Sequence, residues 1–395
     1  MNLNINYFAN QFVFYHLRKI RYGYLQIIDT NDREYFFGNK NSNLKAKIKI
    51  NYPGFFIKLL KKGSSGLGES YINNEFETDD LSSLIELSAR NINVTHKFSG
   101  FFQHFFMSNF FSRNILTNTR KRSQKNISFH YDLGNEFFSA FLDKTLTYSC
   151  GIFNSPDETL EKAQINKYNK LIDLVKPKNG DKILEIGCGW GGFAEHLAKN
   201  YNVKIDCITI SKKQFLFTKQ RIRQSALSDK VNVKMMDYRD VEKKYDIIVS
   251  IEMIEAVGEK YLNEYFNVIK KNLTQGGRGA IQAIIIKDEL YNRYKTKEDF
   301  IQKYIFPGGF LPSFKSLNQL SEKSGLKIDN YKLYGNHYSN TLQKWRSQFL
   351  SSWHIISRQG FDLSFKKMWD FYFSYCDAGF RSKNINLVQF SLCNK

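Results

Sequence analysis

The sequence predicts an α/β fold in which helices cover both faces of a parallel sheet, preceded by a smaller α+β domain. After residue 127, short apolar runs alternate with helical stretches, and a glycine-rich turn joins the first run to the next helix. Such alternation is typical of parallel strands buried on both faces. The expected strands are 183–186, 204–208, 231–235, 245–250 and 279–286. The expected helices are 192–200, 212–224 and 262–272.

Residues 1–112 are expected to form the first domain, which we predict docks on lipid or membrane. Period-two alternation predicts short strands at 22–28, 34–37 and 45–50. The run GSSGLG at 63–68 predicts a break, and Asp79 with Asp80 predicts the start of a helix.

A second group of segments follows this domain. Residues 98–111 are very aromatic and predict a short helix, either buried or touching a membrane. Residues 113–126 are basic and predict a linker, which leaves 127–395 as the main domain. Within it, 326–333 could add edge strands, and 340–375 is expected to be helical.

The charge of the chain suggests an anionic partner. The 58 Lys and Arg residues against 38 Asp and Glu residues give a net charge of +20. Nucleic acid, a phospholipid surface and an acidic substrate all fit this charge, and so does a simple compositional bias. Because the basic residues form no known nucleic-acid motif, we expect no nucleic acid. The 35 Phe and 23 Tyr residues suit an apolar pocket with aromatic walls.

The cysteines and the apolar runs limit the classes of site and location. The chain has five cysteines, and no two stand at the spacing of a zinc site, so we expect no metal. The odd number favours a reducing compartment over a disulfide framework. The start lacks a signal-peptide pattern, and no apolar run approaches about 18 residues. We therefore expect a cytoplasmic protein that contacts the inner face of the membrane peripherally.

The glycine turn at 183–192 (ILEIGCGWGG) carries the main functional signal. Gly187 and Gly189 allow the backbone to turn tightly and approach a ligand. The pattern also satisfies G-x-G-x-x-G, so a nicotinamide dinucleotide must be weighed. Glu185 argues against it, because an acid beside the turn disfavours pyrophosphate and favours a ligand that carries an ammonium and a sulfonium. The next strand also ends, at 208–211, without the acid that a dinucleotide site needs. The sequence thus favours S-adenosylmethionine.

Several blocks resemble the cyclopropane-fatty-acyl-phospholipid synthases, which have the Rossmann-like class I S-adenosylmethionine-dependent methyltransferase fold. The resemblance is close from about residue 127 to the end and looser from about 54 to 91. The blocks that carry it are 129–138 (FHYDLGNEFF), 146–150 (LTYSC), 185–192, 300–309 (FIQKYIFPGG) and 375–381 (YCDAGFR).

The resemblance implies an activity and a cofactor site. The chain would transfer a methylene group from S-adenosylmethionine to the cis double bond of an unsaturated phospholipid acyl chain. A phospholipid membrane surface would be the partner, and the chain could form a homodimer. The implied cofactor-binding residues are Tyr148, Ser149, Glu185, Gly187, Cys188, Gly189, Trp190, Gly191, Thr209, Ile210, Gln214, Tyr238 and Arg239.

The chemistry explains which other groups are needed. An alkene is a poor nucleophile, so the methyl sulfonium must be held in line with it in a dry site. Methyl transfer creates a carbocation, which aromatic faces can stabilise. A base must then remove a proton from the new methyl group so that the ring can close. In the family that base is thought to be bound bicarbonate rather than a side chain.

The resemblance also implies the residues around that anion. Glu255, Tyr338 and the backbone at Cys150 and Ile284 would hold bicarbonate, although Glu252 competes with Glu255 for the role. Two positions depart from the family pattern, because Ala256 and Gln282 stand where many members have histidine. Without a working base, the product would be a methylene- or methyl-branched chain. A non-catalytic lipid-binding protein is a further alternative.

One more residue comes from the resemblance alone. Cys376 resembles the essential cysteine of the family, but the mechanism needs no thiolate nucleophile. A free cysteine on an aromatic helix is usually a small buried apolar group. Cys376 is therefore a candidate catalytic residue without an assigned physical role.

Overall fold

The computed structural model describes residues 2–95, 118–119 and 133–395. It divides into two compact units. The first unit comprises Met1–Asn114, Thr296–Ile305 and Trp353–Asn384, and the second comprises Ile115–Lys295, Phe306–Ser352 and Ile385–Lys395. This division differs from the expected ranges, because two segments of 127–395 belong to the first unit. The expected helix at 98–111 and most of the expected linker at 113–126 lie outside the described residues.

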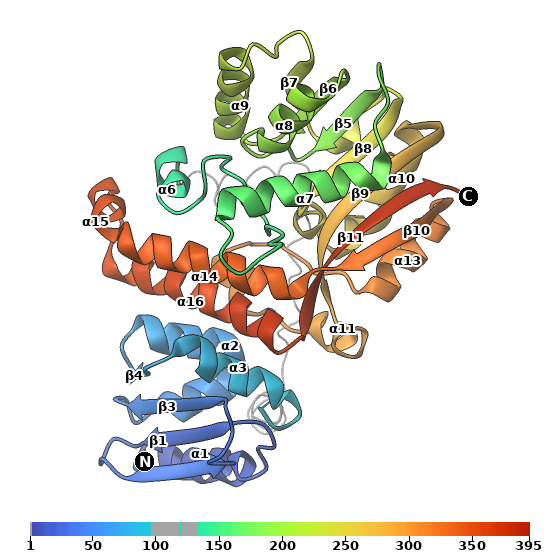
Figure 1. Ribbon diagram of the computed structural model, residues 1–395. Coiled ribbons are helices and arrows are strands. Elements are labelled where there is room, and N and C mark those ends of the chain that lie inside the picture. The colour runs from blue at the N-terminus through green and yellow to red at the C-terminus, as the bar shows by residue number, and fades with distance from the viewer. Residues whose placement is uncertain (1, 96–117, 120–132) are drawn as a thin grey trace. The chain divides into compact units, whose positions relative to one another are not determined.

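The second unit is built on a seven-stranded sheet with the order β10-β11-β9-β8-β5-β6-β7 (Figure 1). The strands from β7 to β9 are parallel, which confirms the predicted α/β sheet. The expected edge strand at 326–333 is confirmed as β10, and at this edge β11 pairs antiparallel with both β9 and β10. The strands are β5 (Lys182–Ile186), β6 (Lys204–Thr209), β7 (Val231–Met235), β8 (Tyr245–Ile251), β9 (Leu273–Ile286), β10 (Leu326–Leu333) and β11 (Ile385–Asn394).

Helices cover both faces of this sheet because successive strand side chains point to opposite sides. On β5, Ile183 packs in the core under α7, α8 and α9, whereas Leu184 and Ile186 pack in the core under α10 and α13. The helices of this unit are α6 (Asn135–Ser139), α7 (Leu160–Val175), α8 (Gly192–Asn200), α9 (Lys212–Gln224), α10 (Leu262–Asn272), α11 (Asp288–Tyr294), α13 (Phe314–Lys323) and α14 (Gly335–Ser351). Three short 3-10 turns are η1 (Tyr238–Asp240), η2 (Ile254–Ala256) and η3 (Glu259–Tyr261).

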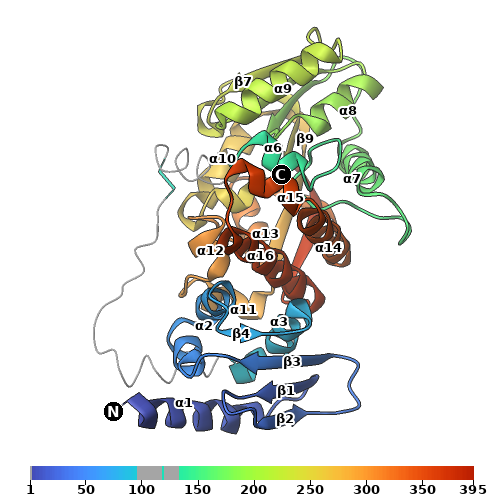
Figure 2. The ribbon, with the colours of Figure 1, turned by 90° about the vertical axis from the view of Figure 1, so that its left-hand side faces the viewer.

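The first unit has its own four-stranded sheet with the order β2-β1-β3-β4. Helix α16 packs against α2 and α3, and Figure 2 shows these three helices side by side. This packing explains why residues far along the chain belong to the first unit. The strands are β1 (Tyr24–Ile28), β2 (Glu34–Gly38), β3 (Lys45–Ile50) and β4 (Phe76–Glu77). The helices are α1 (Asn2–Leu17), α2 (Phe55–Ile72), α3 (Leu81–Arg90), α12 (Phe300–Tyr304), α15 (Trp353–Ile356), η4 (Ser357–Gln359) and α16 (Leu363–Arg381).

Two local predictions for this unit can be compared with the structure. The expected break at 63–68 is confirmed at its first residue, because Gly63, with φ 56° and ψ −130°, is a kink between two helical pieces of α2, whereas residues 64–68 are helical. The predicted start of α3 is confirmed. The Asp80 side chain accepts a hydrogen bond from the Ser83 amide at 3.0 Å, which satisfies a donor that the first helical turn leaves unpaired. No helix in the described part of the chain has the length and apolarity needed to cross a bilayer.

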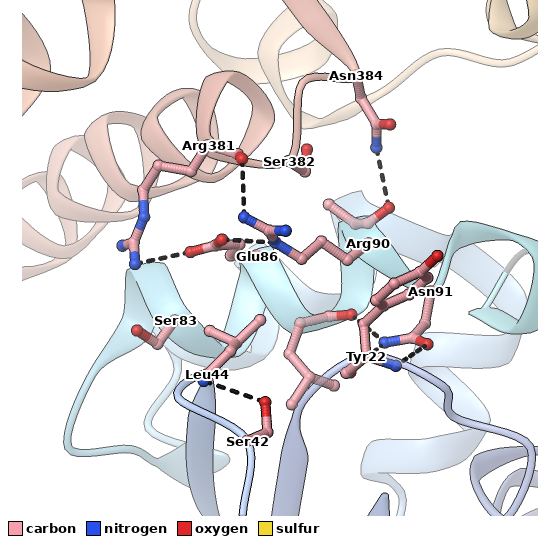
Figure 3. Close-up of polar contacts among 12 residues, drawn as sticks. Tyr22, Ser42, Leu44, Ser83, Glu86, Arg90, Asn91, Arg381, Ser382 and Asn384 are labelled. Atoms are coloured by element: carbon pink, nitrogen blue, oxygen red, sulfur yellow. Dashed lines mark hydrogen bonds and ion pairs between the residues drawn. The ribbon is translucent and has the colours of Figure 1, made fainter. Parts of the chain in front are cut away.

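A buried carboxylate joins α3 to α16 (Figure 3). Glu86 is 3% exposed, and its two oxygens pair with Arg90 Nε at 2.7 Å and Arg381 Nη2 at 2.7 Å. Arg90 also donates to the Arg381 backbone oxygen at 3.1 Å. The carboxylate therefore neutralises two guanidinium groups that would otherwise face each other across the helix contact.

We expect Glu86→Ala to lower the free energy of unfolding by about 3 kcal/mol, because it leaves two close cations without their shared anion. Chemical denaturation of the purified protein measures this change. The matched control is Glu34→Ala, which removes an exposed carboxylate from β2 of the same unit. Equal destabilisation by the two substitutions would contradict a structural role for the Glu86 ion pairs.

Candidate functional site

The glycine turn connects β5 to α8 and is fixed against the end of β6 (Figure 1). The amides of Gly187 and Cys188 both donate to the Ile208 backbone oxygen, at 3.0 and 3.1 Å. Gly187 has φ 81°, and a Cβ there would stand 2.7 Å from Met253 Cγ. Gly189 has φ 53°, but a Cβ there would meet no described atom within 4 Å. A side chain at position 187 would therefore collide with Met253, whereas the space next to Gly189 is empty of described protein atoms.

The rest of the turn is held from the side by neighbouring elements. Trp190 is 2% exposed, and its indole N–H donates to Asn135 Oδ1 at 2.9 Å. Thr218 on α9 donates to the Gly189 oxygen at 3.0 Å, and a Cβ at Gly191 would stand 2.5 Å from Thr218 Cγ2. These contacts fix the backbone before any ligand binds.

Glu185 lies on β5 immediately before the turn and is 2% exposed. Cys207, its partner in the register of β6, places its thiol 3.5 Å from Glu185 Oε2. Burial raises the pKa of Glu185 to about 8, because water cannot solvate the charged form. A buried acid with this pKa is suited to a cationic ligand, whose charge would favour the ionised carboxylate.

Polar groups also gather where β6 ends. The Thr209 hydroxyl donates to Gln214 Oε1 at 2.9 Å, and Ser211 between them caps helix α9. Ile210 is partly buried beside them. Because ligands in open α/β sheets bind at the carboxyl ends of the strands, a hydroxyl and an amide here are well placed for the diol of a ribose.

Arg239 is expected to flank an adenine, and its guanidinium forms an ion pair with Asp237. It binds both oxygens of Asp237, with Nε at 2.9 Å and Nη2 at 2.6 Å, and its Nη1 donates to the Asn118 backbone oxygen at 3.3 Å. The neighbouring Tyr238 is partly buried, and its ring lies edge-on to the Tyr265 ring at 5.7 Å. Tyr238 keeps the ring that could stack on a base, whereas Arg239 supports the turn.

Aromatic rings surround Tyr148. Its ring lies 5.3 Å from Phe138, 5.1 Å from Trp345 and 6.3 Å from Phe306, measured between ring centres. Trp345 also meets the ring of Tyr338 edge-on at 6.2 Å. We call Phe138, Tyr148, Phe306 and Trp345 the aromatic group. The faces of aromatic rings can stabilise a cation.

A buried lysine lies under the site and was missed by the sequence analysis. Lys167 on α7 is 0% exposed and donates to the Ser149 hydroxyl at 2.6 Å. Burial lowers its pKa to about 8. Ser149, expected at the cofactor, is thus held by Lys167. A lysine at a core position of the apolar stripe of α7 is the sequence signal that could have revealed it.

Two glutamates follow strand β8, and they have different partners. Glu252 Oε1 accepts from the Cys150 amide at 2.9 Å and from Gln282 Nε2 at 2.7 Å, and Glu252 Oε2 accepts from the Tyr338 hydroxyl at 2.6 Å. Glu255 Oε1 accepts from the Ile284 amide at 2.6 Å, and Glu255 Oε2 is buried without a hydrogen-bond partner among the described residues.

The residues predicted to surround the anion thus lie close together, but their donors bind two different carboxylates. Cys150, Gln282 and Tyr338 were expected around an anion held by Glu255, yet they bind Glu252. Of the four expected donors, Ile284 alone binds Glu255. The two acids are three positions apart in the sequence, and the turn after β8 decides which one reaches each donor.

The pKa values of both carboxyl groups are raised, but by different causes. Burial, and then the charge of Glu252, raise the pKa of Glu255 from 4.5 to about 8. Burial also raises the pKa of Glu252, but three donors oppose the rise. Because a nearby negative charge disfavours ionisation, the charge of Glu252 favours the protonated form of Glu255.

This pair makes stability depend on pH. Between about pH 4.5 and 8 an unfolded chain has Glu255 ionised while the folded protein keeps its proton, so stability falls as pH rises. Glu255→Gln cannot ionise. We therefore expect this variant to gain stability over the wild type on going from pH 5 to pH 8, by at most about 1.4 kcal/mol per pH unit. Urea unfolding at both pH values measures it, and an identical stability difference at the two values would contradict the raised pKa.

Cys376 belongs to a different unit from these residues. It stands on α16 of the first unit, whereas the other nominated residues belong to the second unit. Burial, followed by the charges of Asp299 and Asp377, raises the pKa of its thiol well above the ordinary value. The thiol is therefore protonated at neutral pH, which does not favour a nucleophilic role. His130 and Asp132, from one of the resemblance blocks, lie outside the described residues.

The comparisons with known proteins agree on one family. A family model described as mycolic acid cyclopropane synthetase matches residues 118–390. The chain is 34% identical over 353 residues to the cyclopropane-fatty-acyl-phospholipid synthase of Escherichia coli, with 88% of each chain covered. It is 34% identical over 342 residues to the tuberculostearic acid methyltransferase UfaA1 of Mycobacterium tuberculosis, with 84% of this chain and 79% of that protein covered.

A solved structure agrees in fold. The mycolic acid cyclopropane synthase CmaA1, in complex with SAH and CTAB, matches with a TM-score of 0.63 and 27% sequence identity. The match covers 69% of this chain and 98% of that chain.

Proposed function

Because this chain belongs to the mycolic acid cyclopropane synthetase family, we propose that it converts the cis double bond of an unsaturated phospholipid acyl chain into a cyclopropane ring. The family and its relatives make the chain an S-adenosylmethionine-dependent methyltransferase of lipid metabolism. The phospholipid substrate and the cyclopropane product are the proposed parts.

One observation supports alkene chemistry above all. Tyr338 joins a carboxylate to the aromatic group, since its hydroxyl donates to Glu252 at 2.6 Å and its ring meets Trp345 at 6.2 Å. A carbocation formed here would lie between π faces and an anion. No nucleophilic side chain is required, and burial keeps the thiol of the nearby Cys150 protonated by raising its pKa.

The residues at the turn fit S-adenosylmethionine, which supplies an activated methyl group when bound. Gly189 leaves space for a ligand to approach the backbone. Glu185 offers a buried acid to the ammonium and sulfonium charges. Thr209 and Gln214 offer a hydroxyl and an amide to the ribose, and Tyr238 offers a ring to the adenine. The backbone from Gly187 to Gly191 and the Tyr148–Ser149 pair complete the proposed site.

Bicarbonate fits the structure poorly. The groups expected to bind it already bind protein carboxylates, with Cys150, Gln282 and Tyr338 on Glu252 and Ile284 on Glu255. A second anion at this place would lie close to Glu252, and none of these four described donors would be left for it. We therefore assign bicarbonate no step.

We propose a phospholipid membrane surface as the partner, contacted peripherally at its inner face in the cytoplasm. The net charge of +20 supports this, since cations near an anionic surface contribute about 1 kcal/mol each. The smaller first unit is proposed to dock on the membrane, and assembly into a homodimer is a further proposal.

A branched product is the second candidate. The similarity to the tuberculostearic acid methyltransferase UfaA1 favours it, because that protein's name implies methylation of a fatty acid. Both candidates begin with the same methyl transfer. For a ring, a proton of the new methyl group leaves as the C–H electron pair closes on the neighbouring cation. For a methylene branch, a hydride first moves from the methylated carbon to that cation, and the methyl proton then leaves to form the double bond.

Lipid analysis of cells that express the protein tests the proposal. We expect unsaturated phospholipid acyl chains to gain the mass of one CH2 unit in a host that lacks its own synthase. Ozonolysis then separates the candidates, because a cyclopropane resists it and a methylene branch is cleaved. Unaltered acyl chains in cells that contain folded protein would contradict the proposed function.

A further inference from the structure

The side chain of Glu252 is held by hydrogen bonds from several parts of the second unit. It accepts from three donors on three separate parts of the second unit: the Cys150 amide before α7, Gln282 on β9 and Tyr338 on α14. A carboxylate has two oxygens, and both are used, which orients the group completely. Charge-assisted hydrogen bonds of 2.6–2.9 Å of this kind are the strong ones.

The backbone is adapted to hold this side chain. Glu252 has φ 50°, a left-handed conformation that costs a non-glycine residue about 1 kcal/mol. Its amide donates to the Gln282 oxygen at 2.8 Å, which ties the residue to β9. Strain of this kind persists where the surrounding structure determines it, and it is common at functional sites.

The side chain of Gln282, one of the three donors to Glu252, is oriented by Gln389. Gln282 Oε1 accepts from Gln389 Nε2 at 2.8 Å, so the amide of Gln282 must direct its N–H groups toward Glu252 and the Cys150 oxygen. Gln282 and Gln389 are direct partners in the β9–β11 register and are 0% and 1% exposed. A histidine is not needed at this place, because the buried amide pair fixes the donor.

We propose that the carboxylate of Glu252 is the built-in base of the reaction and stands in place of a bound bicarbonate. This inference rests on the proposed function and adds a catalytic residue to it. The protein carboxylate has the same charge as bicarbonate and takes the donors that the anion would need. The buried oxygen of Glu255 has no hydrogen-bond partner among the described residues, and burial followed by the charge of Glu252 raises the pKa of Glu255.

The step balances with this base alone. One alkene carbon bonds to the methyl carbon of S-adenosylmethionine, and the electron pair of the broken S–C bond stays on sulfur. The other alkene carbon becomes the cation. Glu252 takes a proton from the former methyl group, and the C–H electron pair forms the ring bond to the cation. The proton then leaves Glu252 for water, and S-adenosylhomocysteine and the cyclopropane are the products.

The test measures turnover of purified enzyme on unsaturated phospholipid vesicles in buffer freed of carbon dioxide, with and without added bicarbonate. We expect the wild type to be fully active without bicarbonate. Glu252→Gln keeps the shape but cannot accept the proton, so kcat should fall about 1,000-fold while cofactor affinity stays within threefold. The kcat of Glu255→Gln should fall about tenfold. Glu242→Gln, at an exposed carboxylate of the same unit, is the matched control.

A rescue experiment adds a readout that does not depend on turnover. Glu252→Gly suits the positive φ and vacates the three donors. We expect bicarbonate to raise the Tm of this variant in a saturable way and to leave the Tm of the wild type unchanged. Bicarbonate should also raise the turnover of the variant at least tenfold.

Three outcomes separate the possible failures. Wild-type turnover that requires bicarbonate would overturn this inference and leave the proposed function standing. So would a Glu252→Gln variant that stays active while Glu255→Gln is inactive. A wild-type enzyme that alkylates no lipid under either condition would refute the proposed function. The Tm response of Glu252→Gly would still show whether bicarbonate binds to the three vacated donors.

Discussion

Gly189→Ala should weaken S-adenosylmethionine binding about 100-fold, which corresponds to about 2.7 kcal/mol. A Cβ at Gly189 meets no described atom within 4 Å, so the methyl group would project into the space where the cofactor must approach the turn. The positive φ of 53° adds strain of about 1 kcal/mol that alanine tolerates. Isothermal titration calorimetry with S-adenosylhomocysteine and S-adenosylmethionine measures the affinity.

Gly180→Ala is the matched control for this variant. Gly180 also has a positive φ, of 86°, and a Cβ there also meets no described atom within 4 Å, but it lies before β5 rather than at the turn. Both variants should lose similar stability, and only Gly189→Ala should lose affinity. Unchanged affinity in a folded Gly189→Ala protein would mean that the turn does not face the cofactor.

The affinity for the cofactor should also depend on pH through Glu185. Burial holds its pKa at about 8 in the free protein, so below pH 8 the carboxyl must lose its proton before it can balance a cationic ligand. The dissociation constant should therefore fall as pH rises from 6 to 8, by up to about tenfold per unit. Binding should release a proton, which calorimetry in buffers of different ionisation enthalpy detects.

Glu185→Gln provides the comparison for this prediction. The amide cannot ionise, so the variant should bind almost as well as the wild type at pH 6 and far more weakly at pH 8. The ratio of the two affinities cancels the titration of the cofactor's own amino group. Affinities that change in parallel with pH would exclude Glu185 from the cationic part of the site.

Most of the second unit's sheet could be predicted from the sequence, because strand and helix periods differ strongly there. The helices at 192–200, 212–224 and 262–272 begin and end as expected. Strand β11 was not predicted, although its run 385–394 is apolar. Its place between β9 and β10 depends on pairing with segments about 60 and 110 residues earlier, which no local pattern encodes.

The boundaries of the two units could not be predicted from local sequence patterns either. Residues 296–305 and 353–384 follow the first strands of the main sheet in the chain, but their apolar faces pack in the first unit. The ion pair between Glu86 and Arg381 joins positions almost 300 residues apart. Only the folded chain reveals such contacts.

The cofactor turn could be identified from residue types, whereas the assignment of the base could not. The turn is contiguous, and its glycines and acid are chemically distinctive. Glu252 and Glu255 are of one type and three residues apart, so composition does not separate them. Their roles depend on a left-handed residue at Glu252 and on donors from β9 and α14, which are long-range features.

The proposed reaction makes the transferred methyl carbon part of a lipid ring. This outcome can be followed by incubating the purified enzyme with S-adenosylmethionine that carries a 13C-labelled methyl group and with vesicles of cis-unsaturated phospholipid. NMR of the extracted lipid should show the label as a cyclopropane methylene. A label found on a headgroup, or no label in the lipid although the cofactor binds, would contradict the account.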